Sequence, residues 1–198
     1  DDSLFFPESH NLVTQNKIVI MYHGSYIPNH GVDTIIECAA LLKDDNRFIF
    51  RLVGDGEQKE GIEALSNKMK IDSIEFLAKV PFVQLYKYIA SANIVLGVFG
   101  NTSQANKAMA NKILEGLAMK KTVVSGDTTS IRENFIHGQD LWLVPLSDAR
   151  ALSEALVTLA ADKDLMDRLA ESGYKVIKNR LTPRIVGVKL VVNLKEML

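Results

Sequence analysis

A lysine and a glutamate three positions apart, Lys112 and Glu115, are the residues of this sequence best suited to chemistry on a ligand. The periodicity predicts a helix from Lys107 to Met119, where this spacing places both side chains on one face. A carboxylate there can accept hydrogen bonds from both hydroxyls of a ribose, and a lysine can meet a diphosphate. Gly116 would let a neighbouring group come close, and Asn111 shares that side of the helix.

A solvated polar stripe is the alternative interpretation of the same pattern. The other face of this helix is apolar, and periodicity alone favours a surface helix with one face in the core. Location favours a ligand, because the helix follows the fourth predicted strand through a long loop that contains a glycine. The residues of the apolar face are Met109, Ala110, Ile113, Leu114, Leu117 and Ala118.

The elements that must position these residues follow from an alternation of short β-branched runs with segments of helical period. Strict alternation predicts right-handed βαβ units that bury a parallel sheet between two helical layers. The expected fold class is α/β, a doubly wound parallel sheet of about six strands with flanking helices. The predicted strands are 17–24, 47–56, 73–80, 93–100, 122–125 and 141–144, and the predicted helices between them are 31–45, 57–70, 81–92, 107–119 and 129–135.

The residues just after each strand mark the expected ligand site, because open parallel sheets bind ligands beyond the carboxyl ends of their strands. Glycines follow the first, second and fourth strands, so a ligand can approach the backbone there. The helices behind these loops offer N–H groups suited to a phosphate. A nucleotide or its diphosphate is the expected guest. The residues in question are His23–Ser25, Gly54–Glu57, Lys79 and Val80, and Phe99–Thr102.

Two common nucleotide motifs do not explain the function. The stretch GDGEQKEG, which begins at Gly54, has Lys59 where a dinucleotide fingerprint needs its third glycine. The stretch GSYIPNHG lacks the Gly-Lys-Ser/Thr ending of a P-loop. Neither NAD binding nor P-loop ATP hydrolysis is therefore expected.

Composition excludes several other classes. Lys and Arg total 23 against 24 for Asp and Glu, so charge gives no reason to expect a nucleic acid partner. The single cysteine, Cys38, cannot form a disulfide, and the four histidines lack the paired spacing of a zinc site. No metal is expected. Without a signal peptide or a long apolar run, the sequence predicts a cytoplasmic protein.

The C-terminal part of the chain predicts helices only. Its last segment, 181–198, is apolar on nearly every side, too short to span a bilayer and too apolar to lie in water. We expect it to pack on this domain or on a missing one, and an interfacial membrane helix is the alternative. The predicted organisation is a polar, turn-like segment at 1–16, an α/β domain at 17–180, and this C-terminal helix.

In order and spacing, these segments resemble the C-terminal, donor-binding domain of GT-B glycosyltransferases, in the retaining family 4, or glycosyl transferases group 1. The similarity covers nearly the whole chain, and it implies an interdomain linker remnant at 1–16, a Rossmann-like nucleotide-sugar-binding domain at 17–180 and a C-terminal helix at 181–198. The segments that carry it are DDSLFFP, similar to the family's interdomain linker, followed by GSYIPNHGVDTIIECAALL, FRLVGDGEQ, IEFLAKVPFVQLYKYIASANIVL, NKILEGLAMKKTVVSGD and IRENFIHGQDLWLVP.

The resemblance implies a role for each loop and for the helix at Lys112. The loop after the first strand would face the donor diphosphate through backbone N–H groups, and the loop after the third would meet the nucleobase. Phe99 and Gly100 would line the donor sugar, Lys112 would help with the phosphates, and Glu115 would hold the ribose. The expected substrate-binding residues are Gly24, Ser25, His30, Gly54, Lys79, Val80, Phe99, Gly100, Asn111, Lys112 and Glu115.

The implied activity is transfer of a sugar, with retention, from a nucleoside diphosphate donor to a saccharide or lipid-linked acceptor. Family members characteristically need no metal or other cofactor, because cationic side chains and helix dipoles stabilise the leaving diphosphate. The acceptor site and catalytic residues would lie in an N-terminal domain absent from this chain, so we expect donor binding without turnover. The full-length enzyme is then cytoplasmic, with peripheral membrane association as an option.

The sequence departs from the family pattern at three places. Ser25 and His30 stand where many members carry arginine and lysine, and no acid stands near Gly97, where the first glutamate of the family's pair would fall. Polar residues 101–107 form an insertion that either takes over the sugar contacts or marks a different donor. Two alternatives therefore stay open: a non-catalytic nucleotide-sugar-binding or interaction module, and another GT-B enzyme such as a sugar-nucleotide epimerase or a phosphorylase.

Overall fold

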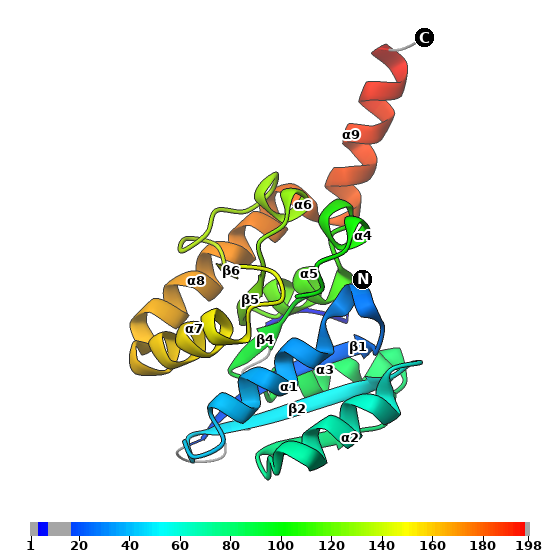
Figure 1. Ribbon diagram of the computed structural model, residues 1–198. Helices are drawn as coiled ribbons and strands as arrows, with labels where there is room; N and C mark the ends of the chain where they lie inside the picture. Colours follow the sequence, from blue (N-terminus) through cyan, green and yellow to red (C-terminus); the bar gives the residue numbers. More distant parts are fainter. Residues whose placement is uncertain (1–3, 8–16, 197–198) are drawn as a thin grey trace.

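The structure is a computed structural model that describes residues 4–7 and 17–196. Within these residues the strands form one parallel sheet of six strands in the order β3-β2-β1-β4-β5-β6. Figure 1 shows the sheet with its surrounding helices. This confirms the predicted doubly wound α/β fold, whose strand order reverses between β1 and β4. The strands are β1 (Ile18–Ser25), β2 (Phe48–Asp55), β3 (Ile74–Leu77), β4 (Ile94–Leu96), β5 (Thr122–Gly126) and β6 (Trp142–Val144).

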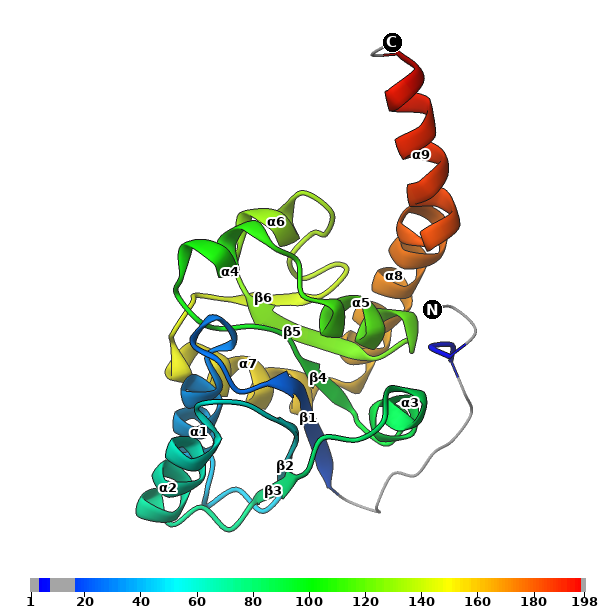
Figure 2. The same ribbon diagram turned by 90° about the vertical axis from the view of Figure 1, so that its right-hand side faces the viewer.

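Helices cover both faces of this sheet, as Figure 2 shows. The α1, α2 and α7 helices pack with one face of the strands, and α3, α5 and α6 pack with the other. The helices are α1 (Val32–Leu41), α2 (Lys59–Met69), α3 (Phe82–Ala90), α4 (Ser103–Lys107), α5 (Asn111–Ala118), α6 (Thr129–Arg132), α7 (Ala149–Ala161), α8 (Lys163–Val176) and α9 (Pro183–Glu196), with a 3₁₀ turn η1 (Pro28–His30) and a π-helical turn η2 (Ile177–Leu181).

The β1 strand shows how the two faces are built. Because side chains alternate along a strand, Ile20 and Tyr22 join the core under α1, whereas Val19 and Met21 join the core under α3 and α5. The same alternation turns His23 toward the α5 side. A strand buried on both faces explains why its sequence is apolar almost throughout rather than at every second residue.

The helix predicted from Lys107 to Met119 is wrong in its first turn. Helix α4, which was not predicted, ends at Lys107, and α5 begins only at Asn111 after an extended connection. Thr102 caps α4 by accepting a hydrogen bond from the Ala105 N–H, at 3.1 Å. The capping threonine explains why the polar stretch 101–107, interpreted as an insertion in a loop, contains a helix of its own.

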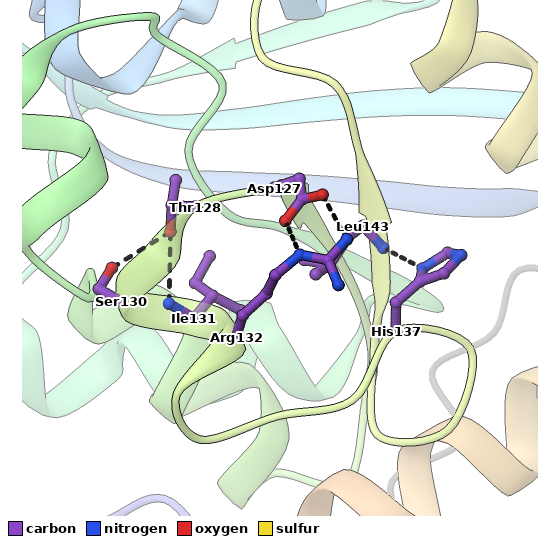
Figure 3. Close-up of polar contacts among 7 residues, drawn as sticks. All are labelled: Asp127, Thr128, Ser130, Ile131, Arg132, His137 and Leu143. Atoms are coloured by element: carbon purple, nitrogen blue, oxygen red, sulfur yellow. Dashed lines mark hydrogen bonds and ion pairs between the residues drawn. The ribbon is translucent and has the colours of Figure 1, made fainter.

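The corner after β5 holds α6, whose end also differs from the prediction, and Figure 3 shows the polar contacts there. Thr128 caps α6 through the Ile131 N–H, and Arg132 donates two hydrogen bonds of 2.5 Å to Asp127. Helix α6 ends at Arg132, three residues before the predicted end at Phe135. His137 Nδ1 accepts from the Leu143 N–H at 2.9 Å, so this histidine fastens the loop to β6.

Gly116 is required by close packing between α5 and the sheet. A Cβ atom at this position would lie 2.9 Å from Cγ2 of Val123 and 3.1 Å from Cβ of Val95, on β5 and β4. Both valines are fully buried and stiff at χ1, so neither can move aside cheaply. The neighbour that this glycine admits is therefore the sheet itself.

We expect Gly116→Ala to lower the free energy of unfolding by about 1 kcal/mol, because overpacking by about 1–3 kcal/mol outweighs a gain of about 1 kcal/mol in helix propensity. Gly61→Ala is the matched control, since a Cβ at Gly61 in α2 would meet no atom within 4 Å. It should raise stability by up to about 1 kcal/mol. Urea unfolding of both variants measures the difference, and shifts of equal sign would contradict this account of Gly116.

Helix α9 projects from the body of the domain (Figure 1). The large apolar side chains along it are exposed, between 47% and 59%. We expected segment 181–198 to pack on this domain or on a missing one. The described part of α9 does not pack on this domain. The exposed residues are Val186, Val188, Leu190, Val191, Val192 and Leu194.

The predicted linker at 1–16 lies largely outside the described residues. Within its described part, Phe5 is buried and packs edge-on against Phe82 of α3, with 5.3 Å between ring centroids. Across residues 4–7 and 17–196, no helix combines the length and apolarity needed to cross a bilayer.

Candidate functional site

A cavity of about 650 Å³ opens at the carboxyl ends of β1 and β2, beside the start of α3. Five of the expected substrate-binding residues line it: Gly24, Ser25, Gly54, Lys79 and Val80. They come from three different strand ends, which the parallel sheet brings to one edge. The complete lining is His23, Gly24, Ser25, Val53, Gly54, Asp55, Gly56, Lys79, Val80, Phe82 and Leu85.

Lys112 crosses the end of β1 beside this cavity. It is only 5% exposed, and its Nζ lies 4.4 Å from the centre of the Tyr22 ring and donates to Tyr22 Oη at 3.4 Å. Gly24 makes room for it, because a Cβ there would lie 2.9 Å from Nζ. Gly24 also has a φ of 137°, which disfavours any other residue. The alternative interpretation, a solvated stripe on α5, is therefore wrong for Lys112.

Burial shifts the pKa values of both charged residues on α5. Burial lowers the pKa of Lys112 to about 7, and nearby Glu115 opposes this shift. Burial raises the pKa of the Glu115 carboxyl, with Lys112 opposing. For both groups, lost hydration thus outweighs their mutual attraction, and shifts of this kind are common among residues of functional sites.

His23 joins this pair from β1. Its Nε2 lies 3.6 Å from Glu115 Oε2, and the His23 side chain is 6% exposed. Burial, helped by the positive charge of Lys112, lowers the pKa of His23 to about 3, so the imidazole is neutral at physiological pH. The contact is therefore one between a neutral ring and a carboxyl group, and not an ion pair.

Ser25 and His30 meet through backbone and ring atoms. Tyr22 Oη donates to the Ser25 carbonyl oxygen at 2.6 Å, and His30 Nδ1 lies 2.6 Å from the same oxygen and 3.0 Å from Tyr22 Oη. The Ser25 side chain is exposed at the cavity. Burial also lowers the pKa of His30, so this ring too is neutral. His30 thus fixes the loop beyond β1.

Six expected residues are not part of the cavity lining: His30, Lys112 and Glu115, described above, and three that lie elsewhere. Phe99 is fully buried in the core on the α1 side of the sheet. Gly100 packs against η1, since a Cβ on it would lie 2.1 Å from the Pro28 carbonyl oxygen. Asn111 is exposed in the first turn of α5. Their predicted ligand contacts stay predictions.

Sequence reasoning missed the apolar wall of the cavity and one buried polar group. Val53, Phe82 and Leu85 supply the wall, and Phe82 is 52% exposed despite its apolar ring. His23 was noted after the first strand but was not counted as a site residue. The signal that could have found it is a histidine inside an otherwise apolar strand, immediately before the glycine of the loop.

The arrangement combines a buried lysine with an apolar wall. Lys112 stands in the first turn of α5, whose N-cap, Ala110, provides no side-chain acceptor for the first N–H groups, so both features favour a negative ligand. Glu115 adds an acceptor for hydroxyl groups. In the described residues no group of three or more His, Cys, Asp and Glu side chains is placed to hold a metal ion.

Curated relatives resemble the chain over most of its length. An uncharacterised glycosyltransferase of Methanocaldococcus jannaschii is 24% identical over 172 residues, which cover 86% of this chain and 46% of that protein. The capsular polysaccharide biosynthesis glycosyltransferase CapM of Staphylococcus aureus is 22% identical, over 96% of this chain and 49% of CapM. The chain therefore spans about half the length of these relatives.

Solved structures share the fold at low identity. The C-terminal domain of the glycosyl transferase group 1 protein LpcC of Francisella tularensis has a TM-score of 0.80 at 18% identity, over 92% of this chain and 98% of that domain. Anabaena HepE, solved in complex with UDP-glucose, has a TM-score of 0.84 at 18% identity, over 99% of this chain and 55% of HepE. A family model described as glycosyl transferases group 1 matches residues 17–162 of this chain. The chain therefore belongs to that family.

Proposed function

We propose that this domain binds the nucleoside diphosphate sugar of a glycosyltransferase that transfers the sugar, with retention, to a saccharide or lipid-linked acceptor. The observation that carries the proposal is the placement of buried Lys112 over Gly24, with Glu115 and the cavity beside it. A buried cation without an ionised partner in contact is costly unless a ligand supplies the negative charge.

Each part of the donor has a matching surface. The diphosphate belongs near Gly24 and Ser25, within reach of Lys112, and the ribose belongs at Glu115. The base fits against the wall that Val53, Phe82 and Leu85 form, with Lys79 and Val80 at its edge. Aromatic and aliphatic walls bind a flat base by area, while a few polar groups fix its orientation.

The relatives support the sugar donor and the pathway class. HepE has been solved in complex with UDP-glucose, and CapM acts in capsular polysaccharide biosynthesis. We therefore favour a UDP-sugar donor and a polysaccharide or glycolipid product. No metal or other cofactor enters the proposal, because Lys112 and the first turn of α5 supply the positive charge that a leaving diphosphate needs.

The remainder of the enzyme completes the proposal. The acceptor site and the catalytic groups belong to an N-terminal GT-B domain, in a cytoplasmic enzyme with an option of peripheral membrane association. We propose that the N-terminal GT-B domain also covers α9. Apolar side chains lie all around α9, which suits burial in a protein groove better than a membrane surface, where one face would be polar.

Calorimetric titration of the domain with UDP-glucose and with a GDP-sugar tests the proposal. We expect one of them to bind in the micromolar to millimolar range, which is usual for such donors. Incubation with the bound donor should release no sustained UDP or GDP, because the transfer chemistry needs the other half. If neither nucleotide sugar binds, a non-catalytic interaction module is favoured. Sustained release of UDP or GDP would contradict the proposal that transfer needs the N-terminal domain.

A further inference from the structure

We propose that His23 is a positioning residue that holds the Glu115 carboxylate in place for the ribose of the donor. The inference rests on the proposed function and names a residue that neither the sequence pattern nor the relatives assign. It concerns how the site distinguishes a ribose from a sugar without hydroxyls, which is a property separate from donor binding itself.

The position of His23 in β1 directs it at Glu115. It follows Val19 and Met21 on the face of the sheet that α5 covers, so its ring points toward that helix. The residue is 4% exposed and still lines the cavity, at the last buried position before Gly24. An apolar side chain would be usual at this buried position of β1, so the polar ring of His23 calls for a polar partner.

The Nε2 atom of His23 has no hydrogen-bond partner among the described residues and lies near Glu115. It is also buried. Glu115 Oε2 lies 3.6 Å away, just beyond hydrogen-bond range. Leaving a buried donor without a partner costs about 1–3 kcal/mol, so a small movement of Glu115 that closes the gap is favourable. Contacts of this kind are often long without ligand and tighten when it binds.

The charge state of the ring fits this role. Burial and the positive charge of Lys112 keep His23 neutral, so one ring nitrogen carries hydrogen and the ring adds no positive charge beside Glu115. An Nε2–H donated to one carboxylate oxygen leaves the other oxygen for the ribose hydroxyls. A protonated histidine would instead neutralise the carboxylate and compete with Lys112.

Substituted variants and two ligands test the inference. His23→Phe keeps an aromatic ring and removes the N–H, whereas His23→Gln keeps an N–H donor at a similar reach. We expect His23→Phe to bind UDP about tenfold more weakly and to bind 2′,3′-dideoxy-UDP, which lacks both hydroxyls, with unchanged affinity. His23→Gln should restore most of the UDP affinity.

An equal loss for both ligands, or no loss for UDP, would overturn the positioning role. Failure of the wild-type domain to bind UDP at all would instead refute the proposed function, so the two failures are distinguishable. Nitrogen-15 spectra of the histidine rings provide a measurement on the unsubstituted protein. With UDP bound we expect the Nε2–H form of His23, and the Nδ1–H form with a bare Nε2 would contradict the inference.

Discussion

Lys112→Met is expected to weaken UDP-sugar binding by about 100-fold while leaving the folded domain at least as stable as the wild type. The binding loss follows because the variant removes the buried cation that the donor diphosphate would meet. Truncating one partner of a buried, charged hydrogen bond costs about 2–5 kcal/mol, and about 2.7 kcal/mol corresponds to 100-fold.

The stability of this variant should not fall, because the ammonium group is buried against a tyrosine ring and the end of a strand. Without ligand, the charge of Lys112 has little compensation for its lost hydration. Methionine has a similar volume and no charge, so it should leave the free energy of unfolding unchanged or raise it by about 1–2 kcal/mol. Calorimetric titration and urea unfolding measure the two effects.

Lys121→Met is the matched control. Lys121 is also partly buried, and burial lowers its pKa, but it donates to the Ala90 carbonyl oxygen at 2.6 Å, away from the cavity lining. Its replacement should leave donor affinity unchanged and cost about 1 kcal/mol of stability. Equal binding losses in the two variants would show that Lys112 acts through general charge rather than through contact.

Donor affinity should fall as the pH rises above 7. The free domain loses the Lys112 proton near that pH, since burial lowers this pKa to about 7. A bound diphosphate raises the pKa again, so binding takes up a proton between the free and bound pKa values. The affinity for UDP-glucose should therefore decrease by up to about tenfold per pH unit in that window.

The other groups around Lys112 do not produce the same profile. His23 and His30 have lowered pKa values and are neutral from pH 7 upward, and Tyr22 has a raised pKa. Glu115 has a raised pKa, so its loss of charge would weaken ribose binding on the acid side only. Titrations from pH 6 to 9 in buffers of different ionisation enthalpy should show proton uptake, and Lys112→Met should abolish it. An affinity that rises with pH would refute this linkage.

The sheet was predictable because local patterns and global topology agree in this chain. Alternating β-branched runs and helical periods give the strands, and the parallel arrangement then brings Gly24, Gly54 and Lys79 to one edge. Helix α4 was less predictable, since the Thr102 cap starts it locally, inside a polar stretch that has no hydrophobic period.

The burial of Lys112 could not be derived from its own helix. Periodicity placed it on the polar side of α5, but the side chain is buried because Gly24, on a distant strand, lacks a Cβ where the ammonium passes. The same holds for His23, whose partner Glu115 comes from another element. Such pairings depend on how the strand and the helix pack together, which a single sequence does not report.

The sole tryptophan gives the domain a convenient internal probe. Trp142 lies on β6, packed edge-on to His137 with ring centroids 5.1 Å apart, whereas the cavity lies over the strands toward the opposite edge of the sheet. Its fluorescence should follow cooperative unfolding and stay silent when a nucleotide is added. Trp142 fluorescence can therefore report the unfolding of every variant, and bound nucleotide should not change the signal.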